Sequence, residues 1–259
     1  MSVLSAIYHD RRFRSVVFPL LLALLWSLST HYGWVSSLVL VPFSDLFVAL
    51  KDASVRQSLL EGLAATFGRL LQGAAIGICV GLLLGLGMGM SRAFDRVMGP
   101  SFHAVRQVAV LAWVPLLTAW FGNGDLCKII FVAIAAAMPA VMGAYEGARN
   151  APPALLEVGR ILKFTRFKTL RYVILPAAAP AIFTGIQLSL IYSWFAAVGA
   201  EYVIGVMSGG IGSVVVGAQE HFRTDIVLLG VIFISLVGIF MNKLLKRLPA
   251  LLFPWKTRI

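Results

Sequence analysis

The chain has 259 residues, of which 59% are hydrophobic and only 13% are charged, and its mean hydropathy is +0.90. Soluble globular proteins carry roughly 25% charged residues, so this composition excludes an ordinary water-exposed surface. The apolar residues form long runs of about 20 residues, which is the length that a helix needs to cross a bilayer. These runs do not alternate as the strands of a membrane barrel do. The sequence therefore predicts an all-α, polytopic transmembrane helical bundle.

The net charge is +11 at neutral pH. A basic chain can bind nucleic acid, but in a membrane protein Lys and Arg mark the cytoplasmic loops. We therefore expect a lipid bilayer, and no nucleic acid, as the partner of this charge. Cys79 and Cys127 lie in apolar runs, and the four histidines are scattered. This pattern predicts no disulfide, no metal site, no cofactor-binding residues and no catalytic residues on this chain.

Six transmembrane spans are predicted from the apolar runs. In chain order they cover residues 16–32, 62–90, 101–121, 126–145, 177–203 and 225–245. A basic start precedes the first span, and no convincing cleavage site follows it, so we expect an uncleaved span. A mixed segment, 33–61, follows the first span, a Gly-Asn-Gly-Asp turn separates the third from the fourth, and a Gly-rich loop, 204–224, precedes the sixth.

The distribution of Lys and Arg predicts the orientation. With the N-terminus inside, 17 of the 22 basic residues lie in inside segments, four lie in outside segments, and Arg69 lies within the second span. Arg106 is among the inside residues. Cytoplasmic loops carry an excess of Lys and Arg, so both termini are predicted to be cytoplasmic. An even number of spans agrees with that orientation.

The second span contains glycines at every fourth position. They are Gly73, Gly77, Gly81, Gly85 and Gly89. Small residues at this spacing leave a stripe of bare backbone on a helix, which lets another helix approach closely. The sequence therefore predicts that a second helix packs against this stripe.

Arg69 is predicted to lie about two turns inside the outer end of the second span. A charge at this depth is costly unless it has a partner. Two interpretations follow. Arg69 is either a structural arginine that bonds to helix ends or interfacial water, or an electrostatic contact for an anionic solute.

The long inside segment between the fourth and fifth spans, residues 146–176, predicts a short amphipathic helix. Asn150 is the expected cap, and the two prolines that follow suit a first turn. Apolar residues with helical spacing then fall on one side: Leu155, Val158, Ile161 and Leu162. A helix this short and charged does not span a membrane, so it lies either on lipid or in a groove of another protein.

The fifth span carries polar and aromatic residues on two opposite faces. One face holds Gln187, Trp194 and Glu201, and the other holds Ser189, Tyr192 and Ser193. Polar residues in a span either line a solute path or bond to neighbouring helices. The candidate solute-pathway residues are Arg69, Gln187, Tyr192, Trp194 and Glu201.

The loop resembles the membrane subunit of bacterial ABC importers. The signature of that family is Glu-Ala-Ala, three residues, Gly, nine residues, and Ile-x-Leu-Pro. At the same spacing, this chain has Glu157-Val158-Gly159, Lys163 and Val173-Ile174-Leu175-Pro176. Lys163 replaces the signature glycine. If that glycine forms a tight turn after the helix, the lysine must adopt the same conformation at a cost, or the turn must differ.

Further segments resemble the subgroup that imports sulfonates, taurine, nitrate and related solutes. They are Trp120-Phe121-Gly122 after Pro115, Leu175-Pro176 with Pro180, Ala200-Glu201, Gly210-Ile211-Gly212 and Phe222-Arg223-Thr224-Asp225. Each is short, but together and in this order they are characteristic of the subgroup. The resemblance implies a multi-pass protein of the bacterial cytoplasmic (inner) membrane, with residues 1–259 as a single permease domain for a small, sulfonate-like anion.

The resemblance also implies partners. They are a second copy of the chain, a solute-binding protein outside, and cytoplasmic ATPase subunits that bind ATP and Mg. The residues implied to contact the ATPase are Leu155, Glu157, Val158, Gly159, Arg160, Leu162 and Lys163. The chain has no Gly-x-x-x-x-Gly-Lys-Ser/Thr motif, so it is not expected to be an enzyme.

Two alternatives are a self-sufficient secondary transporter and a purely structural membrane subunit. A secondary transporter often contains an inverted repeat, and no clear repeat is visible here. Glu201 is the one plausible intramembrane carboxylate for such a mechanism, and it lies near a span end. A structural subunit would not explain a charged loop helix at the signature spacing.

Overall fold

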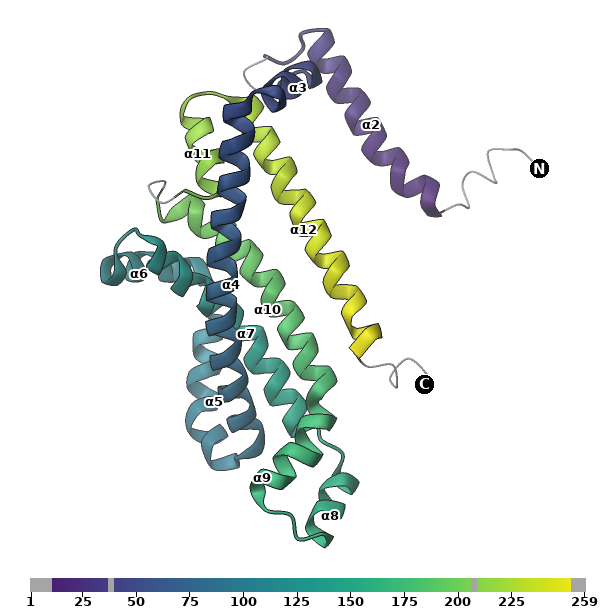
Figure 1. Ribbon diagram of the computed structural model, residues 1–259, viewed down its shortest axis with the longest axis vertical. Coiled ribbons are helices and arrows are strands. Elements are labelled where there is room, and N and C mark those ends of the chain that lie inside the picture. The colour runs from purple at the N-terminus through teal and green to yellow at the C-terminus, as the bar shows by residue number, and fades with distance from the viewer. Residues whose placement is uncertain (1–10, 37–39, 206–208, 253–259) are drawn as a thin grey trace, which may run out of the picture.

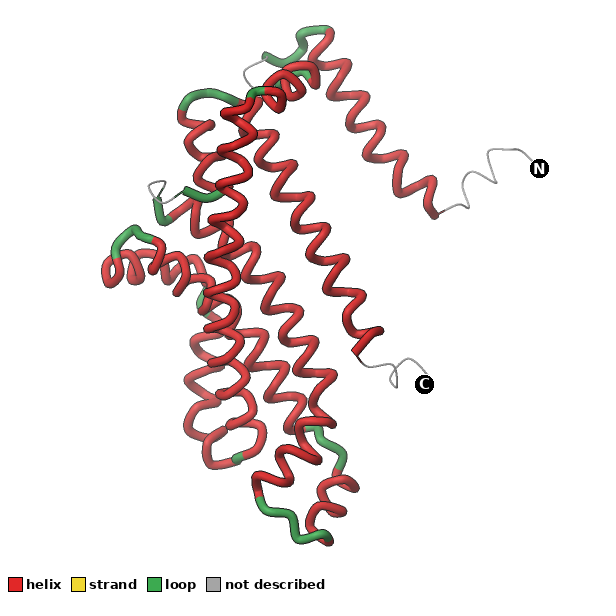
Figure 2. Tube along the Cα trace, in the orientation of Figure 1, coloured by secondary structure: helices red, strands yellow, loops and turns green. Residues whose placement is uncertain are grey.

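The computed structural model describes residues 11–36, 40–205 and 209–252, and these residues form helices and short connections without any strand (Figure 2). In chain order the elements are α2 (Arg11–His31), α3 (Phe43–Lys51), α4 (Ala53–Met90), α5 (Arg92–Gln107), η1 (Val110–Trp113), α6 (Val114–Phe121), α7 (Asp125–Arg149), α8 (Pro153–Ile161), α9 (Arg166–Thr169), η2 (Leu170–Ile174), α10 (Leu175–Val203), α11 (Ile211–Glu220) and α12 (Thr224–Leu252). The predicted all-α bundle is confirmed.

Four helical segments of the described chain are long and apolar enough to cross a membrane. They are Ala53–Met90, Asp125–Arg149, Arg166–Val203 and Thr224–Pro249. They match the predicted second, fourth, fifth and sixth spans, although α4 begins nine residues before the predicted start. The apolar part of α2, Leu20–His31, is shorter and corresponds to the predicted first span.

The predicted third span is wrong as a continuous helix. Residues 92–107 and 110–121 form two helical pieces that meet at an angle of 97°. Val108 and Ala109 between them have extended backbone angles, which end α5. The sequence Val-Pro at the start of α6 explains part of the break, because a proline is accepted in the first turn of a new helix but not inside an old one.

Figure 1 shows the helices as an elongated bundle with two distinct ends. The short helices α8 and α9 lie at one end, and α3 lies at the other. Helix α4 runs between them, and the first residues of α2 and the last residues of α12 point toward the end that carries α8. We call the α8 end the inner end, because the predicted cytoplasmic loop lies there. The cytoplasmic position of the two termini stays a prediction.

The glycine stripe of α4 packs against α7, as predicted. A Cβ atom built on Gly73 would lie 2.6 Å from the Cβ atom of Val132, and one built on Gly81 would lie 2.6 Å from that of Ala140. Real Cβ atoms do not approach so closely, so only glycine permits this spacing. The two helices therefore meet with their backbones almost in contact, which gains dispersion energy in a setting where the hydrophobic effect contributes little.

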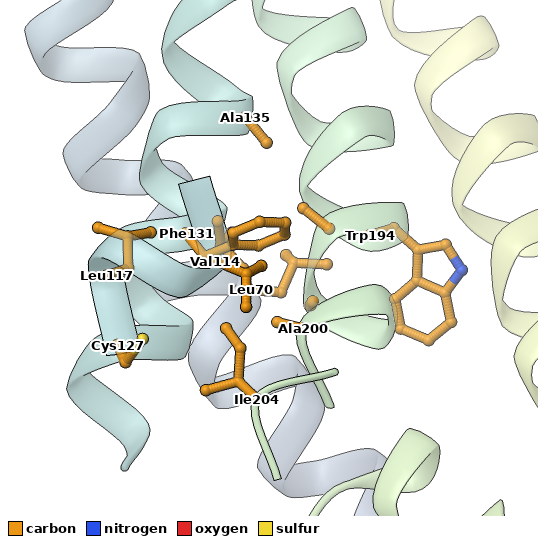
Figure 3. Packing of buried hydrophobic residues seen from close by; sticks show 12 residues of the cluster. Leu70, Val114, Leu117, Cys127, Phe131, Ala135, Trp194, Ala200 and Ile204 are labelled. Atoms are coloured by element: carbon orange, nitrogen blue, oxygen red, sulfur yellow. The ribbon is translucent and has the colours of Figure 1, made fainter. Parts of the chain in front are cut away.

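Buried apolar side chains from α4, α6, α7 and α10 form the main core (Figure 3). Phe131 of α7 and Leu70 of α4 lie in the middle of this group, and the indole of Trp194 extends from α10 toward α12. A second cluster joins α3 and α4 to α12 near the outer end, around Leu46, Leu59 and Leu229. The bent segment that replaces the third span is thus held by Val114 and Leu117 of α6.

Candidate functional site

Arg69 of α4 lies inside the protein in an ionic cluster. Its Nη1 atom donates to Oε1 of Glu201 at 2.6 Å and to the carbonyl oxygen of Gly209 at 2.7 Å. Its Nε atom donates to Oδ1 of Asp125 at 2.9 Å. The side chain is only 5% exposed. One arginine therefore joins α4 to the start of α7, the end of α10 and the chain before α11, and we call this group the outer ionic cluster.

Glu201 is fully buried and receives further donors. The hydroxyl of Thr66 lies 2.8 Å from Oε1, and the backbone N–H of Gly212 donates to Oε2 at 2.9 Å. Thr66 in turn accepts a hydrogen bond of 3.0 Å from the backbone N–H of Ile211. A buried carboxylate is stable when a cation and hydrogen-bond donors surround it. The start of α11 is thus fixed on a charged anchor.

Glycines make room for this carboxylate. A Cβ atom on Gly210 would overlap the carboxyl group of Glu201, and one on Gly212 would lie 2.9 Å from its Cβ atom. Gly210 also has φ of 127°, a conformation that other residues rarely adopt. Nearby, the buried Lys128 donates from Nζ to the carbonyl oxygen of Gly205 at 2.9 Å. Both ends of the segment between α10 and α11 are therefore bound to cations.

These contacts agree with the interpretation of Arg69 as a structural arginine. The residue lies 16 positions after the start of α4, which is roughly four turns, because the helix begins earlier than the predicted second span. Its charge is compensated by the carboxylates of Glu201 and Asp125. A direct role of Arg69 or Glu201 toward a solute stays a prediction.

Gln187 and Trp194 of α10 face α12. The amide of Gln187 donates to the carbonyl oxygen of Leu245, and the Trp194 ring lies 5.6 Å from the ring of Phe67 and is 3% exposed. On the opposite face, the hydroxyl of Ser189 donates to the carbonyl oxygen of Ala136 in α7 at 2.7 Å. Gln187, Trp194 and Ser189 therefore serve helix packing, and the five predicted pathway residues do not converge on one surface.

Tyr192 differs from the other four, because it lines an open cavity. The cavity has a volume of about 720 Å³ and lies between the end of α5, α7 and α10. Arg106, Glu146 and Thr184 line it as well, together with Met138, Met142 and other apolar residues. Its walls are mainly apolar with a few polar groups, which is the usual character of a small-molecule site. We call it the inner cavity.

The loop after α7 contains the predicted amphipathic helix, α8. The expected cap is wrong: Asn150 ends α7, and α8 begins at Pro153 after Pro152. Pro152 has an extended conformation, which suits a residue before a proline. Leu155, Val158, Ile161 and Leu162 are all exposed on α8, between 46% and 79%. No other part of the described residues, 11–36, 40–205 and 209–252, covers this apolar face at the inner end.

Lys163 adopts the conformation expected of the signature glycine. Its φ is 51°, in the left-handed region. Its N–H donates to the carbonyl oxygen of Arg160, and the N–H of Phe164 donates to that of Gly159 at 2.9 Å. These two bonds form a Schellman motif, which ends many helices and usually contains glycine at this position. The tight turn is therefore kept with a lysine at this position, at the energetic cost of a left-handed backbone conformation.

Sequence reasoning missed two residues of the inner cavity. Arg106 contributed only to the orientation argument, and Glu146 only marked the start of the loop. A signal existed for Arg106, because it lies inside the predicted third span, where a charge indicates a functional site by default. The Gly-rich loop also contains a helix, α11, that the prediction lacked, since its sequence Ile211–Glu220 is short and glycine-interrupted.

Comparison with known proteins identifies the family. Residues 77–254 match the sequence profile of the binding-protein-dependent transport system inner membrane component. SsuC of Escherichia coli (strain K12), named for aliphatic sulfonates transport, is 33% identical over 220 residues, which are 85% of this chain and 83% of SsuC. The bicarbonate transport system permease protein CmpB of Synechococcus elongatus is 34% identical over 80% of this chain and 72% of its own. The taurine transport system permease protein TauC of Escherichia coli is 30% identical over 79% and 72%.

Solved structures share the fold. The crystal structure of an amino acid ABC transporter with histidines has a chain that superposes with a TM-score of 0.66 at 18% identity, over 78% of this chain and 98% of that one. An inward-facing form of the MetNI methionine ABC transporter gives a TM-score of 0.60 at 18% identity, over 76% and 98%. The chain is therefore a multi-pass membrane protein that belongs to the binding-protein-dependent transport system inner membrane component family, within the sulfonate, taurine and nitrate subgroup of ABC importer permeases.

Proposed function

We propose that this chain is the transmembrane permease subunit of an ATP-driven importer for a small anionic solute of the sulfonate type. Two copies form the pathway, a solute-binding protein delivers the solute outside, and separate cytoplasmic subunits bind ATP and Mg. Family membership supports the permease role. The relatives are named for sulfonates, taurine, bicarbonate and nitrate, whose common feature is a small oxyanion.

The observation that carries the proposal is the geometry of α8. The helix lies at the inner end of the bundle, beyond the membrane-spanning helices (Figure 1). Its apolar residues are exposed, and Glu157 and Arg160 stand among them on the surface. A helix with an apolar face and charged neighbours fits a groove in a partner protein. We propose that Leu155, Glu157, Val158, Gly159, Arg160, Leu162 and Lys163 form this contact with the ATPase.

Gly159 has a distinct place in this contact. It is the buried residue of α8, near Val173 and Phe164, at 3.6 and 3.7 Å from the position of its missing Cβ atom. The helix is thus seated on η2, which continues into α10. A movement of α8 is therefore passed to α10 through this contact and to α7 through the short connection at residues 150–152.

A secondary transporter would use an intramembrane carboxylate that can exchange its ion or proton during the cycle. Glu201, the candidate for that role, is fully buried and is bound to Arg69, Thr66 and the backbone of Gly212. Its position is that of an anchor between helices. The structure thus gives no specific support to the second candidate function.

Glu157→Lys tests the coupling contact. We expect the variant to lose association with the ATPase subunit and to lose ATP-driven uptake, because the charge at the centre of α8 is reversed. Co-purification with the tagged ATPase and uptake by whole cells measure the two effects. Glu220→Lys is the matched control: it makes the same charge change on an exposed residue of α11 at the outer end, and we expect ATPase association to be unchanged. Normal association and normal uptake in Glu157→Lys would contradict the proposal.

The solute is tested on the binding protein. A thermal-shift screen of that partner with taurine, an alkanesulfonate, nitrate and bicarbonate separates the four solute classes. We expect stabilisation by a sulfonate. The absence of stabilisation by any of the four compounds would contradict the anionic class and leave the permease role intact.

A further inference from the structure

The inner cavity contains opposite charges that do not neutralise each other. Among the described residues that line it, Arg106 is the cation and Glu146 is the anion. Both side chains are exposed, and within the described part of the chain neither takes part in a salt bridge or side-chain hydrogen bond. Arg69, in contrast, is bound to two carboxylates and a carbonyl oxygen. The positive charge of Arg106 is therefore available to a ligand.

The two charges lie at different depths. Helix α5 begins at Arg92 near the inner end and runs outward, so Arg106 lies 14 residues along it, or about 21 Å at 1.5 Å per residue. Helix α7 runs in the opposite direction, and Glu146 lies three residues before its inner end at Arg149. Hydrogen bonds from Tyr145 and Arg149 of α7 to Asp95 of α5 join the inner ends of the two helices, which lie toward the bottom of the bundle in Figure 1. Arg106 is thus the deeper charge, and Glu146 is nearer to the inner mouth.

The surroundings of Arg106 strengthen its attraction for an anion. Met138, Met142 and Leu188 form apolar walls, and a charge interaction is stronger beside such walls than in bulk water. Tyr192 lines the same cavity. The hydroxyl of Thr184 donates to the carbonyl oxygen of Pro180 at 2.9 Å. This hydrogen bond fixes the position of the Thr184 hydroxyl oxygen relative to α10. Arginine also offers a planar fork of donors that matches a sulfonate or another oxyanion.

We propose that Arg106 contacts the anionic group of the solute in transit, with Tyr192 beside it, and that Glu146 repels that group at the inner mouth and favours its release. The inference rests on the proposed importer function and assigns it a specificity-determining residue. The assignment differs from the sequence-based expectation, in which Arg69 was the candidate contact. The ligand class is a small oxyanion.

The test measures the charge of the cavity directly. Thr184 is replaced by Cys in a chain that carries Cys79→Ala and Cys127→Ala, and the permease is assembled with its ATPase in lipid vesicles. The new thiol is labelled with two methanethiosulfonate reagents, one with a sulfonatoethyl group and one with a trimethylammonioethyl group. The ratio of the anionic to the cationic labelling rate reports the local potential. We expect Arg106→Gln to lower this ratio by roughly fivefold, as the loss of a unit charge that lines the same cavity predicts.

Matched variants make the test specific. Arg106→Lys keeps the charge and should restore most of the ratio, Glu146→Gln should raise it, and Arg96→Gln, on the same helix but outside the cavity, should leave it unchanged. An unchanged ratio in Arg106→Gln, or no labelling of the Cys at position 184, would overturn the inference. Intact uptake and ATPase association in the parent chain would then show that the proposed function survives. If Arg106→Gln leaves the ratio unchanged and the parent chain also fails to associate with the ATPase, both the inference and the proposed function are rejected.

Discussion

The outer ionic cluster and the inner cavity each contain an arginine within the helical bundle, and their environments are opposite. Arg69 is 5% exposed and is bound by Glu201, Asp125 and a backbone carbonyl. Arg106 is exposed in a cavity of about 720 Å³ and shares it with the carboxylate of Glu146 without pairing. A charged residue in a span therefore does not by itself mark a solute path. Whether such a residue is a structural anchor or a contact for the solute depends on the groups that bind its side chain.

The difference follows from the helices that carry the two residues. Helix α4 is continuous around Arg69, and the glycines of α11 and its preceding segment let a carboxylate approach from α10. Helix α5 ends one residue after Arg106, and the chain then turns through 97°. Arg106 and Val110, on either side of the break, line the cavity together with residues of α7 and α10. A bent segment thus creates accessibility where a straight span would have filled it.

The largest expected effect separates the two arginines by stability. Arg69→Gln leaves the buried Glu201 without its cation and should lower the free energy of unfolding by about 3 to 5 kcal/mol. Arg106→Gln removes an exposed side chain and should change it by about 0.5 kcal/mol or less. Unfolding by sodium dodecyl sulfate, followed by circular dichroism of the purified proteins, measures both. The double variant Arg69→Gln with Glu201→Gln should recover part of the loss, because it removes both charges. Equal losses in the two single variants would show that the comparison is mistaken.

The next effect concerns the α4–α7 contact that both regions share. In Gly81→Ala the new methyl group would lie 2.6 Å from the Cβ atom of Ala140 and 2.8 Å from the carbonyl oxygen of Ala137. We expect a loss of about 1 to 3 kcal/mol from overpacking. Gly68→Ala, on the same helix with open space around it, should be neutral or stabilising by about 0.5 to 1 kcal/mol. The same denaturation assay compares them, and a stabilised Gly81→Ala would disprove the tight contact.

A smaller effect extends the comparison to the exposed loop. Lys163→Gly should stabilise the α8 turn by about 1 kcal/mol, since glycine adopts a φ of 51° without the penalty that a side chain meets. Lys168→Gly in α9 removes an equivalent charge from a helical position and should be destabilising by about 0.5 to 1 kcal/mol. Limited proteolysis of the loop reports the local stability. Faster cleavage in Lys163→Gly than in the parent chain would contradict the expectation.

The smallest effect concerns the surface carboxylate that caps α4. Donation from the hydroxyl and N–H of Ser54 lowers the pKa of Asp52 below that of an ordinary aspartate. Because its folded pKa is depressed, the cap stabilises the fold above the ordinary carboxyl pKa, and this contribution is lost as the pH falls through the lowered value. Asp52→Asn should therefore reduce the pH dependence of unfolding in the acidic range alone. The stability difference between the parent chain and Asp52→Asn should shrink as the pH falls through the acidic range, and a difference that stays the same at low pH would argue against this origin.

The sequence predicted the all-α class, the approximate place of four long spans and the close contact at the glycine stripe. These features depend on composition and on local spacing, which are visible in one dimension. The bend after Gln107 was missed, because the segment 101–121 is apolar enough overall to be taken for one span, and its break depends on how Val114 and Leu117 pack against α7. The partners of Arg69 were missed for the same reason, since Glu201 is 132 positions away. Arg106 was visible as a charge but not as a cavity residue.

The α4–α7 seam also has a mechanical consequence. Where the glycines of α4 meet α7, no flexible side chain lies between the two backbones. We therefore expect the two helices to resist sliding past each other and to move as one rigid unit. Only residues 150–152 separate α7 from α8. We therefore expect a movement of α8 at the inner end to turn this pair of helices. The far end of this helix pair includes Lys128 and Arg69, which bind the carbonyl oxygens of Gly205 and Gly209, so we expect the same movement to shift the outer segment that precedes α11.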